Sequence, residues 1–182
     1  MDNCLKFTNH AYAVQLKCLR FIGLIFKLFY TRNADTFIKL FPTIDYGAII
    51  YTNTSRNVER SIEKIQRIFT KRLFKKLYPH KDLPNYDDRL RFFSLESLKA
   101  RYCKMGLVTI YKLRSGLLSI DGINLRSSSH HLNRILLPSA HSALYRNSFL
   151  FRNVVLWNRL IPKRSFVSLH EFITFVNSIS FD

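Results

Sequence analysis

Hydrophobic residues recur at three- and four-residue steps between residues 58 and 77. At about 100° per residue, this spacing places them on one face of an α-helix. The apolar positions are Val58, Ile62, Ile65, Phe69, Leu73 and Leu77. Basic residues recur half a turn away, at Arg60, Lys64, Arg67, Lys71 and Lys75. The pattern predicts a helix that buries one face and presents a basic stripe, roughly 30 Å long at about 1.5 Å per residue, on the other.

Residues 10–30 carry hydrophobic side chains on more than one side of a helix, and the basic Lys17, Arg20 and Lys27 share the remaining arc. We expect a mostly buried helix with these cations at the rim of the core. A helix lying on a membrane surface is the alternative.

A second apolar segment covers residues 36–51 and follows polar residues 31–35, which predict a turn. Pro42 interrupts the segment and predicts a kink or a restart of the helix. Composition alone would also allow a strand at residues 44–51, but the spacing favours a helix.

The second half of the chain continues mainly in helical patterns. An apolar series with a register shift near Ser94 predicts two helices between residues 86 and 111, and the Ser- and Gly-containing residues 116–129 predict a loop. A short strand is expected at residues 135–137.

Two more helices are predicted before the end of the sequence. One covers residues 148–160, with Trp157 in the core. The last begins at Ser168 as N-cap, with Glu171 at the capping-box position.

Together these patterns predict a protein that is all-α or nearly so. We expect a three-helix unit in residues 1–79, followed by a looser helical region over residues 80–182 with a mobile loop near residues 115–133.

Charge narrows the class of partner. The chain has 29 Lys and Arg against 12 Asp and Glu, a formal net charge of +17. A small folded domain with such self-repulsion indicates a polyanionic partner, either nucleic acid or an anionic membrane surface. The hydrophobic content of 47% indicates a folded protein rather than a basic disordered tail. A surface helix whose charges are merely solvated remains the alternative for the basic face taken alone.

Several classes of protein are disfavoured. Cys4, Cys18 and Cys103 are odd in number and far apart, so they offer neither a disulfide framework nor a CxxC metal site. The longest apolar run, residues 21–26, is far shorter than the about 20 residues that span a bilayer. The first residues lack the basic region of a signal peptide. We expect an intracellular protein that is not secreted and has no transmembrane segment.

Several short motifs follow one another along almost the whole chain. They are Leu5-Lys6-Phe7-x-x-His10, Phe21-Ile22, Pro42-x-x-Asp45-Tyr46-Gly47, Glu63-Lys64-Ile65-Gln66-Arg67, Tyr86-Asp87-Asp88-Arg89-Leu90, Leu95-x-x-Leu98-x-x-Arg101, Ile110-Tyr111-Lys112, Asn147-Ser148-Phe149-x-x-Arg152 and Leu156-Trp157-Asn158-x-Leu160-x-Pro162. In this order and spacing the chain resembles the reverse transcriptase polyprotein of LINE-type non-LTR retrotransposons, closest to the jockey-like group. Tyr51 stands where that family usually has a tryptophan, and Leu160-Ile161-Pro162 replaces its Leu-Pro pair.

The resemblance implies that the chain corresponds to the thumb and the region that follows it, without fingers or palm. In that family, the carboxylates that hold two catalytic Mg²⁺ ions belong to the palm. The chain alone is therefore expected to be inactive and to bind no cofactor, with Mg²⁺ present only in the palm of a partner polymerase chain. A nuclear location is suggested by the resemblance alone.

Other motifs do not predict catalytic or metal-binding residues. Tyr86-Asp87-Asp88 resembles the metal-binding turn of reverse transcriptases, but one intervening residue is missing and Arg89 follows directly. We interpret this segment as acidic residues at a helix N-terminus. His130-His131 has no Cys or carboxylate at ligand spacing and is interpreted as part of a loop.

We therefore expect a thumb-like helical domain that binds a primer-template duplex, either an RNA/DNA hybrid or DNA. Its contacts would go to phosphates and would not read the base sequence. The expected contact residues are Arg60, Lys64, Arg67, Lys71, Arg72, Lys75 and Lys76. Two alternatives stay open: a cationic amphipathic membrane-surface protein that inserts residues 21–29, and a non-functional relic of a retrotransposon reading frame.

Overall fold

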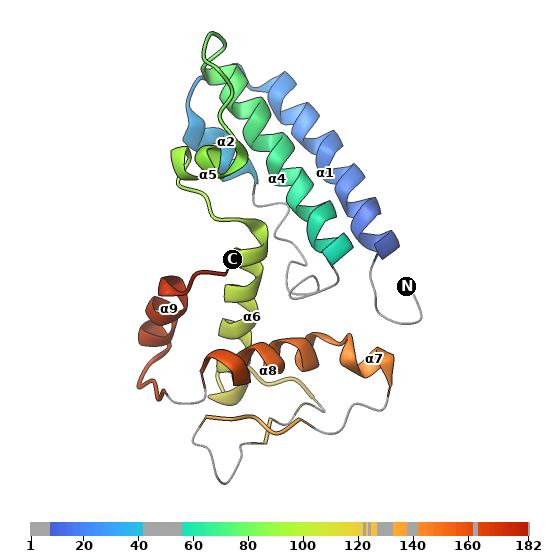
Figure 1. Ribbon diagram of the computed structural model, residues 1–182, viewed down its shortest axis with the longest axis vertical. Helices are drawn as coiled ribbons and strands as arrows, with labels where there is room; N and C mark the ends of the chain where they lie inside the picture. Colours follow the sequence, from blue (N-terminus) through green and yellow to red (C-terminus); the bar gives the residue numbers. More distant parts are fainter. Residues whose placement is uncertain are drawn as a thin grey trace. The chain divides into compact units, whose positions relative to one another are not determined.

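The computed structural model describes residues 8–41, 56–121, 123, 125–126, 133–137, 142–161 and 164–181. Over these ranges the protein is mainly helical and has no strand (Figure 1). The all-α fold class is confirmed. The chain divides into two compact units, one holding the described residues up to Leu98 and the other those from Lys99 onward.

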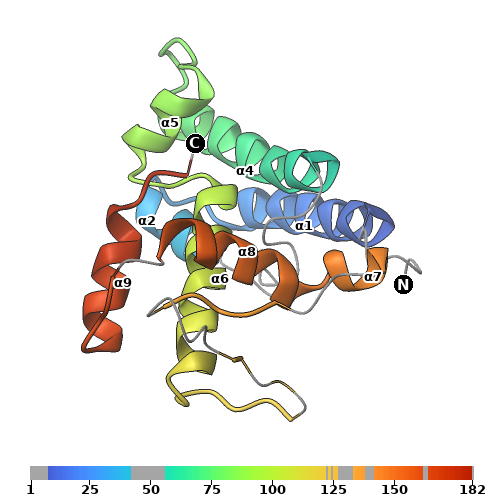
Figure 2. The ribbon, with the colours of Figure 1, turned by 60° about the horizontal axis from the view of Figure 1, so that its bottom comes forward.

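Two long helices form the frame of the first unit. Helix α1 (Thr8–Leu28) and helix α4 (Arg56–Leu77) lie side by side in both ribbon views and run in the same direction (Figures 1 and 2). The short helices α2 (Ala34–Leu40) and α5 (Tyr86–Phe92) pack against α4. Helix α4 is thus the central element of this unit, as its strong amphipathic pattern predicts.

Aromatic rings join α1, α2 and α4. Phe37 of α2 stacks on Phe26 of α1 with ring centroids 4.9 Å apart, and Phe41 stacks on Phe69 of α4 at 4.0 Å. Such ring pairs add to the free energy gained from burying their area.

The side chain of Asn33 caps the start of α2, because it accepts a hydrogen bond from the N–H of Asp35 at 2.8 Å.

The expectation that the first helix is mostly buried is wrong. Ile22 and Ile25 are buried, but Leu16, Leu24 and Leu28 of the same helix are 41–67% exposed. Over the described residues, α1 packs along one side against α4 and Phe37 of α2, and several of its apolar residues on the other sides stay exposed.

Helix α5 belongs with the first unit, although we expected a boundary near residue 79. The side chain of Arg89 reaches Thr70 of α4, and Phe92 packs edge-on against Phe74 at 5.6 Å. These contacts tie the segment after Pro79 back onto α4. The compact unit therefore extends to Leu98.

The break between α5 and helix α6 (Leu98–Arg114) confirms the two helices expected between residues 86 and 111. Ser94 lies in this break with a φ of 52°, a left-handed conformation that a continuous helix does not contain. At its other end α6 is followed by Gly116, whose φ of 74° suits a glycine directly after a helix.

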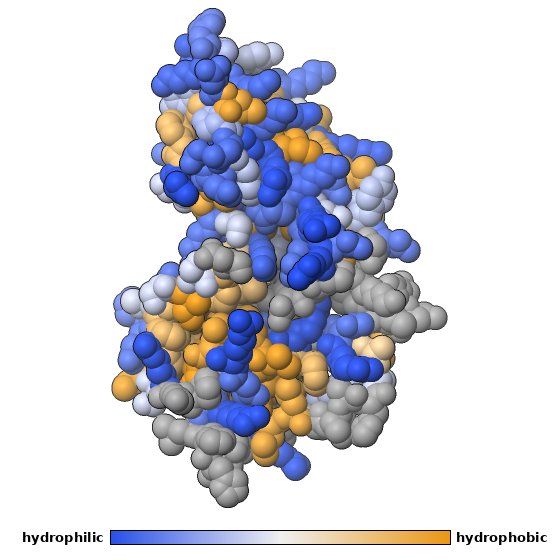
Figure 3. Space-filling model, viewed as in Figure 1, coloured by the Kyte–Doolittle hydropathy of each residue, from blue (hydrophilic) through white to orange (hydrophobic). Residues whose placement is uncertain are grey.

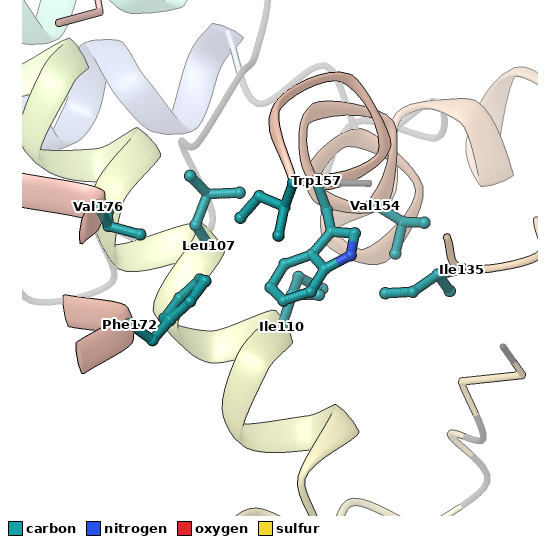
Figure 4. Packing of buried hydrophobic residues seen from close by; sticks show 8 residues of the cluster. Leu107, Ile110, Ile135, Val154, Trp157, Phe172 and Val176 are labelled. Carbon is teal, nitrogen blue, oxygen red and sulfur yellow. The ribbon is translucent and has the colours of Figure 1, made fainter. Parts of the chain in front are cut away.

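Three further helices complete the second unit: α7 (Ala143–Arg146), α8 (Phe149–Leu160) and α9 (Leu169–Ser178). Trp157 is 1% exposed, which confirms the prediction that it lies in the core. Figure 4 shows its indole among aliphatic side chains, with Phe172 of α9 nearby and the ring nitrogen on the side of Ile135. The core consists of Leu107, Ile110, Ile135, Val154, Trp157, Ile161, Phe172 and Val176.

The prediction of a short strand at residues 135–137 is wrong. Ile135 makes an isolated bridge, and Leu136 N–H donates to the carbonyl of Arg126 at 2.8 Å. The side-chain amide of Asn158 accepts from Ile135 N–H at 2.9 Å and donates to the Ile135 carbonyl at 2.8 Å. It thereby occupies both backbone groups that a neighbouring strand would pair with.

The prediction that Ser168 caps the last helix is confirmed, whereas Glu171 reaches back one residue further than in a capping box. Ser168 Oγ accepts from the N–H of Glu171 at 3.2 Å, and the Glu171 carboxylate accepts from Val167 N–H at 2.9 Å. Two sequence predictions lie outside the described residues: the helix over residues 42–51 and the loop position of His130-His131.

Candidate nucleic-acid interface

Helix α4 carries the candidate interface on the face opposite its core contacts. Phe74 is buried against Phe92 of α5. Along one face, α4 packs Val58, Ile62, Ile65, Phe69 and Leu73 into the first unit. The opposite face holds five exposed cations, which we call the basic stripe: Arg60, Lys64, Arg67, Lys71 and Lys75. From Arg60 to Lys75 the stripe extends about 22 Å at a rise of about 1.5 Å per residue. The structure therefore brings five of the seven expected contact residues together on one exposed face.

Arg67 is held in place by Tyr86 at the start of α5. Its guanidinium lies over the tyrosine ring, 4.4 Å from the centroid. The Tyr86 hydroxyl donates a hydrogen bond to the carboxylate of Glu63, one turn before Arg67. Burial and this hydrogen bond to Glu63 raise the pKa of Tyr86 far above its ordinary value of 10. The ring thus stays neutral and supports the guanidinium by a cation–π contact.

A second arginine, Arg89, anchors α5 rather than facing solvent. It is 7% exposed, and its guanidinium donates to the Pro84 carbonyl at 2.6 Å and to Thr70 Oγ1 at 3.4 Å. Burial lowers the pKa of this guanidinium. Arg89 therefore fixes the position of Tyr86, and through it that of Arg67.

The structure confirms that Tyr86-Asp87-Asp88 forms the start of a helix. Asp87 and Asp88 lie in the first turn of α5, where negative charge is favourable. Asn85 is the N-cap and accepts from the N–H of Asp88 at 2.9 Å. Both carboxylates are exposed and follow Tyr86, the residue whose ring contacts Arg67 of the stripe.

The remaining expected contacts, Arg72 and Lys76, lie on the side of α4 that faces α1. Arg72 is exposed, and its guanidinium lies across Gly23 of α1, 3.9 Å from the position that a Cβ would occupy there. This distance is an ordinary van der Waals contact, so the Arg72 side chain packs against the surface of α1.

Lys76 has a different environment from the stripe. Its ammonium donates to the carbonyls of Phe26 at 3.2 Å and Phe29 at 2.6 Å, at the C-terminal end of α1. It also lies 5.3 Å from the centroid of the Phe37 ring. A cation at this end of a helix satisfies carbonyls that lack a helical partner and interacts favourably with the helix dipole. Sequence spacing cannot reveal this contact, because it depends on how α1 and α4 pack.

Helix α1 adds three positive charges, which the sequence predicted at the rim of a core. Lys17, Arg20 and Lys27 are all exposed on this helix, next to α4. Figure 3 shows the first unit, in the upper part of the view, as mostly hydrophilic with hydrophobic side chains between. The cations of α1 and α4 together make this unit strongly basic.

No group of three or more His, Cys, Asp or Glu residues that could hold a metal ion is found among the described residues. Within the same ranges, no helix combines the length and the apolar character that crossing a membrane requires.

Comparison with known proteins assigns the chain to no family. No protein-family model, no curated protein and no solved structure matches it.

Proposed function

We propose that this chain binds a nucleic-acid duplex through the basic stripe of α4. The observation that carries the proposal is the alignment of five exposed cations on one straight helix face, opposite a well-packed core. Such a row matches a phosphate backbone, in which charges repeat along a line, and it positions the duplex without reading its sequence.

Arg67 is the preorganised member of this interface. Because Tyr86 supports its guanidinium from one side, less side-chain entropy is lost when it pairs with a phosphate. Lys64, Lys71 and Lys75 supply flexible point charges on either side of it, and Arg72 lies at the flank. We leave Lys76 out of the proposed contacts, since its donors are directed to the carbonyls of α1.

From the resemblance to LINE-type reverse transcriptases, we further propose that this duplex is a primer-template hybrid. In that proposal the chain supplies no catalytic group, and polymerisation needs the palm and the Mg²⁺ ions of a partner polymerase chain. A nuclear location would follow from the same role. These finer statements rest on the sequence motifs.

Charge reversal on the stripe tests the proposal. The triple variant Lys64→Glu, Arg67→Glu and Lys71→Glu should lose measurable binding to a blunt RNA/DNA hybrid in fluorescence anisotropy, with unchanged helical content by circular dichroism. The matched control reverses three exposed arginines of the second unit, Arg134, Arg146 and Arg159. It carries the same net charge and should retain most of the affinity.

Equal loss of affinity in both triple variants would mean that only net charge matters. Unchanged binding by the stripe variant would show that its charges are merely solvated. Either result would overturn the proposed interface.

A second candidate function is binding to an anionic membrane surface, favoured by one observation. Helix α1 exposes Leu16, Leu24 and Leu28 alongside its cations, as interfacial helices do. Replacing Leu24 and Leu28 by Glu should abolish binding to phosphatidylserine vesicles if this function holds, and should leave hybrid binding nearly unchanged if the duplex is the partner.

A further inference from the structure

The second unit contains a hollow of about 210 Å³ that the basic stripe does not involve. Its lining consists of three aromatic residues, one arginine, one asparagine and two serines: Tyr111, Trp157, Phe166, Arg114, Asn133, Ser115 and Ser165. Among these lining residues are a positive charge and several hydrogen-bonding groups, but no carboxylate.

The aromatic part of the lining is ordered around one buried ring. Phe172 of α9 stacks on Tyr111 with centroids 4.4 Å apart and meets Phe166 edge-on at 5.0 Å. Trp157 lies 5.4 Å from the same ring. Trp157 is 1% exposed and forms the floor, whereas Tyr111 and Phe166 are half-buried and form walls. The walls are therefore preorganised by packing.

Asn133 organises the polar part of the lining. Its backbone carbonyl accepts from the Trp157 indole N–H at 2.8 Å, and its side-chain oxygen accepts from Arg114 Nη1 at 2.6 Å. Its amide nitrogen donates to the carbonyl of Arg164. The Arg114 guanidinium is held 5.9 Å from the centre of the Trp157 ring, and burial lowers its pKa. A nearby anion would stabilise this partly desolvated cation.

We propose that the hollow binds one unpaired nucleotide of a nucleic-acid strand, with the base against Tyr111 and Phe166 and its phosphate paired with Arg114. The volume suits a single ring system and is smaller than the about 300–1,000 Å³ of pockets for drug-sized ligands. Aromatic walls accept the flat face of a base, and a guanidinium pairs with phosphate. The inference rests on the proposed nucleic-acid function but concerns a different site and a single strand.

Trp157, the one tryptophan of the chain, reports on this site directly. Its fluorescence in the full-length protein is titrated with a short single-stranded oligothymidine and with a strand of equal length made of abasic residues. The thymidine strand should quench the fluorescence to saturation. The abasic strand, which has the phosphates without the bases, should bind about tenfold more weakly and cause no quenching.

Two variants and one control locate the binding. Ser165→Phe fills the hollow from an exposed position, and Arg114→Gln removes the phosphate partner. Each should weaken binding of the thymidine strand about tenfold, equal to about 1.4 kcal/mol. Arg146→Gln removes a comparable charge from exposed helix α7 and should leave the affinity unchanged. Thermal unfolding of every variant checks the fold.

The outcomes separate this inference from the duplex proposal. The variant with Glu at residues 64, 67 and 71 should still show quenching by the thymidine strand, even though it no longer binds the blunt hybrid. Hybrid binding by the wild type without quenching by the thymidine strand would overturn the hollow alone. Quenching without hybrid binding would overturn the duplex proposal alone. Equal binding of thymidine and abasic strands, or no effect of Ser165→Phe in a folded variant, would also overturn the hollow.

Discussion

Lys75 and Lys76 are neighbours in sequence but have different surroundings. Lys75 is exposed on the basic stripe, whereas the ammonium of Lys76 donates to two carbonyls at the end of α1. One residue of sequence corresponds to about 100° of rotation on a helix, which is enough to place Lys75 on the proposed interface and Lys76 in a structural contact with α1.

The two lysines should therefore respond differently to the same substitution. Lys75→Met should leave the free energy of unfolding unchanged and reduce the slope of log affinity against log salt by about 0.9. Lys76→Met should reduce the free energy of unfolding by about 1 kcal/mol, since the α1 carbonyls lose a charged donor, and leave the slope unchanged. The reverse result would place Lys76 in the interface. Urea unfolding and anisotropy make the two measurements.

Trp157 should dominate the stability of the second unit. Because its side chain is fully buried and its indole N–H bonds to Asn133, Trp157→Ala should cost about 3–5 kcal/mol of unfolding free energy. Val155→Ala on the exposed side of the same helix is the control and should cost less than about 1 kcal/mol. Urea unfolding followed by circular dichroism measures both. Similar small losses in the two variants would contradict the packing described.

The support of Arg67 by Tyr86 predicts a dependence on alkaline pH. The folded protein holds the Tyr86 pKa above its ordinary value of 10, while the unfolded chain ionises near that value. The stability that the neutral ring contributes is thus complete below about pH 10 and is lost as the pH rises above it. The difference in unfolding free energy between wild type and Tyr86→Phe should shrink from pH 9 to about pH 11. A constant difference would contradict the assigned environment.

At the scale of elements, the sequence predicts best where local pattern and tertiary packing agree. Helix α4 has one apolar and one basic face, so its approximate bounds and most of its buried face follow from spacing, except for the burial of Gln66, Thr70 and Phe74. The start of α9 at Ser168 follows from its capping residues. These features need no knowledge of the rest of the fold.

Prediction failed where a distant partner decides the outcome. Apolar residues surround α1, but among the described residues only one side of this helix is packed, and Leu24 and Leu28 stay exposed. Ile135 lies in an apolar run that resembles a strand, but the Asn158 amide takes the place of a neighbouring strand. The spacing of cations on α4 located the stripe, whereas the roles of Asn133 and Lys76 depend on tertiary contacts that spacing does not encode.

At the scale of the whole molecule, the net charge of +17 makes some binding to any polyanion expected. The location and the salt dependence of binding therefore test the proposed interface, whereas binding as such does not. A stripe that pairs with about four phosphates releases about four counterions and gives a defined slope. Diffuse attraction to an anionic vesicle depends instead on buried apolar area and lipid charge.

The most direct test is fluorescence anisotropy of the full-length chain with a labelled RNA/DNA hybrid, titrated across salt concentration with phosphatidylserine vesicles as competitor. If the stripe binds the duplex, log affinity should fall with log salt at a slope near −4, and vesicles should compete weakly. A much shallower slope, or ready displacement of the hybrid by vesicles, would contradict duplex binding through the basic stripe.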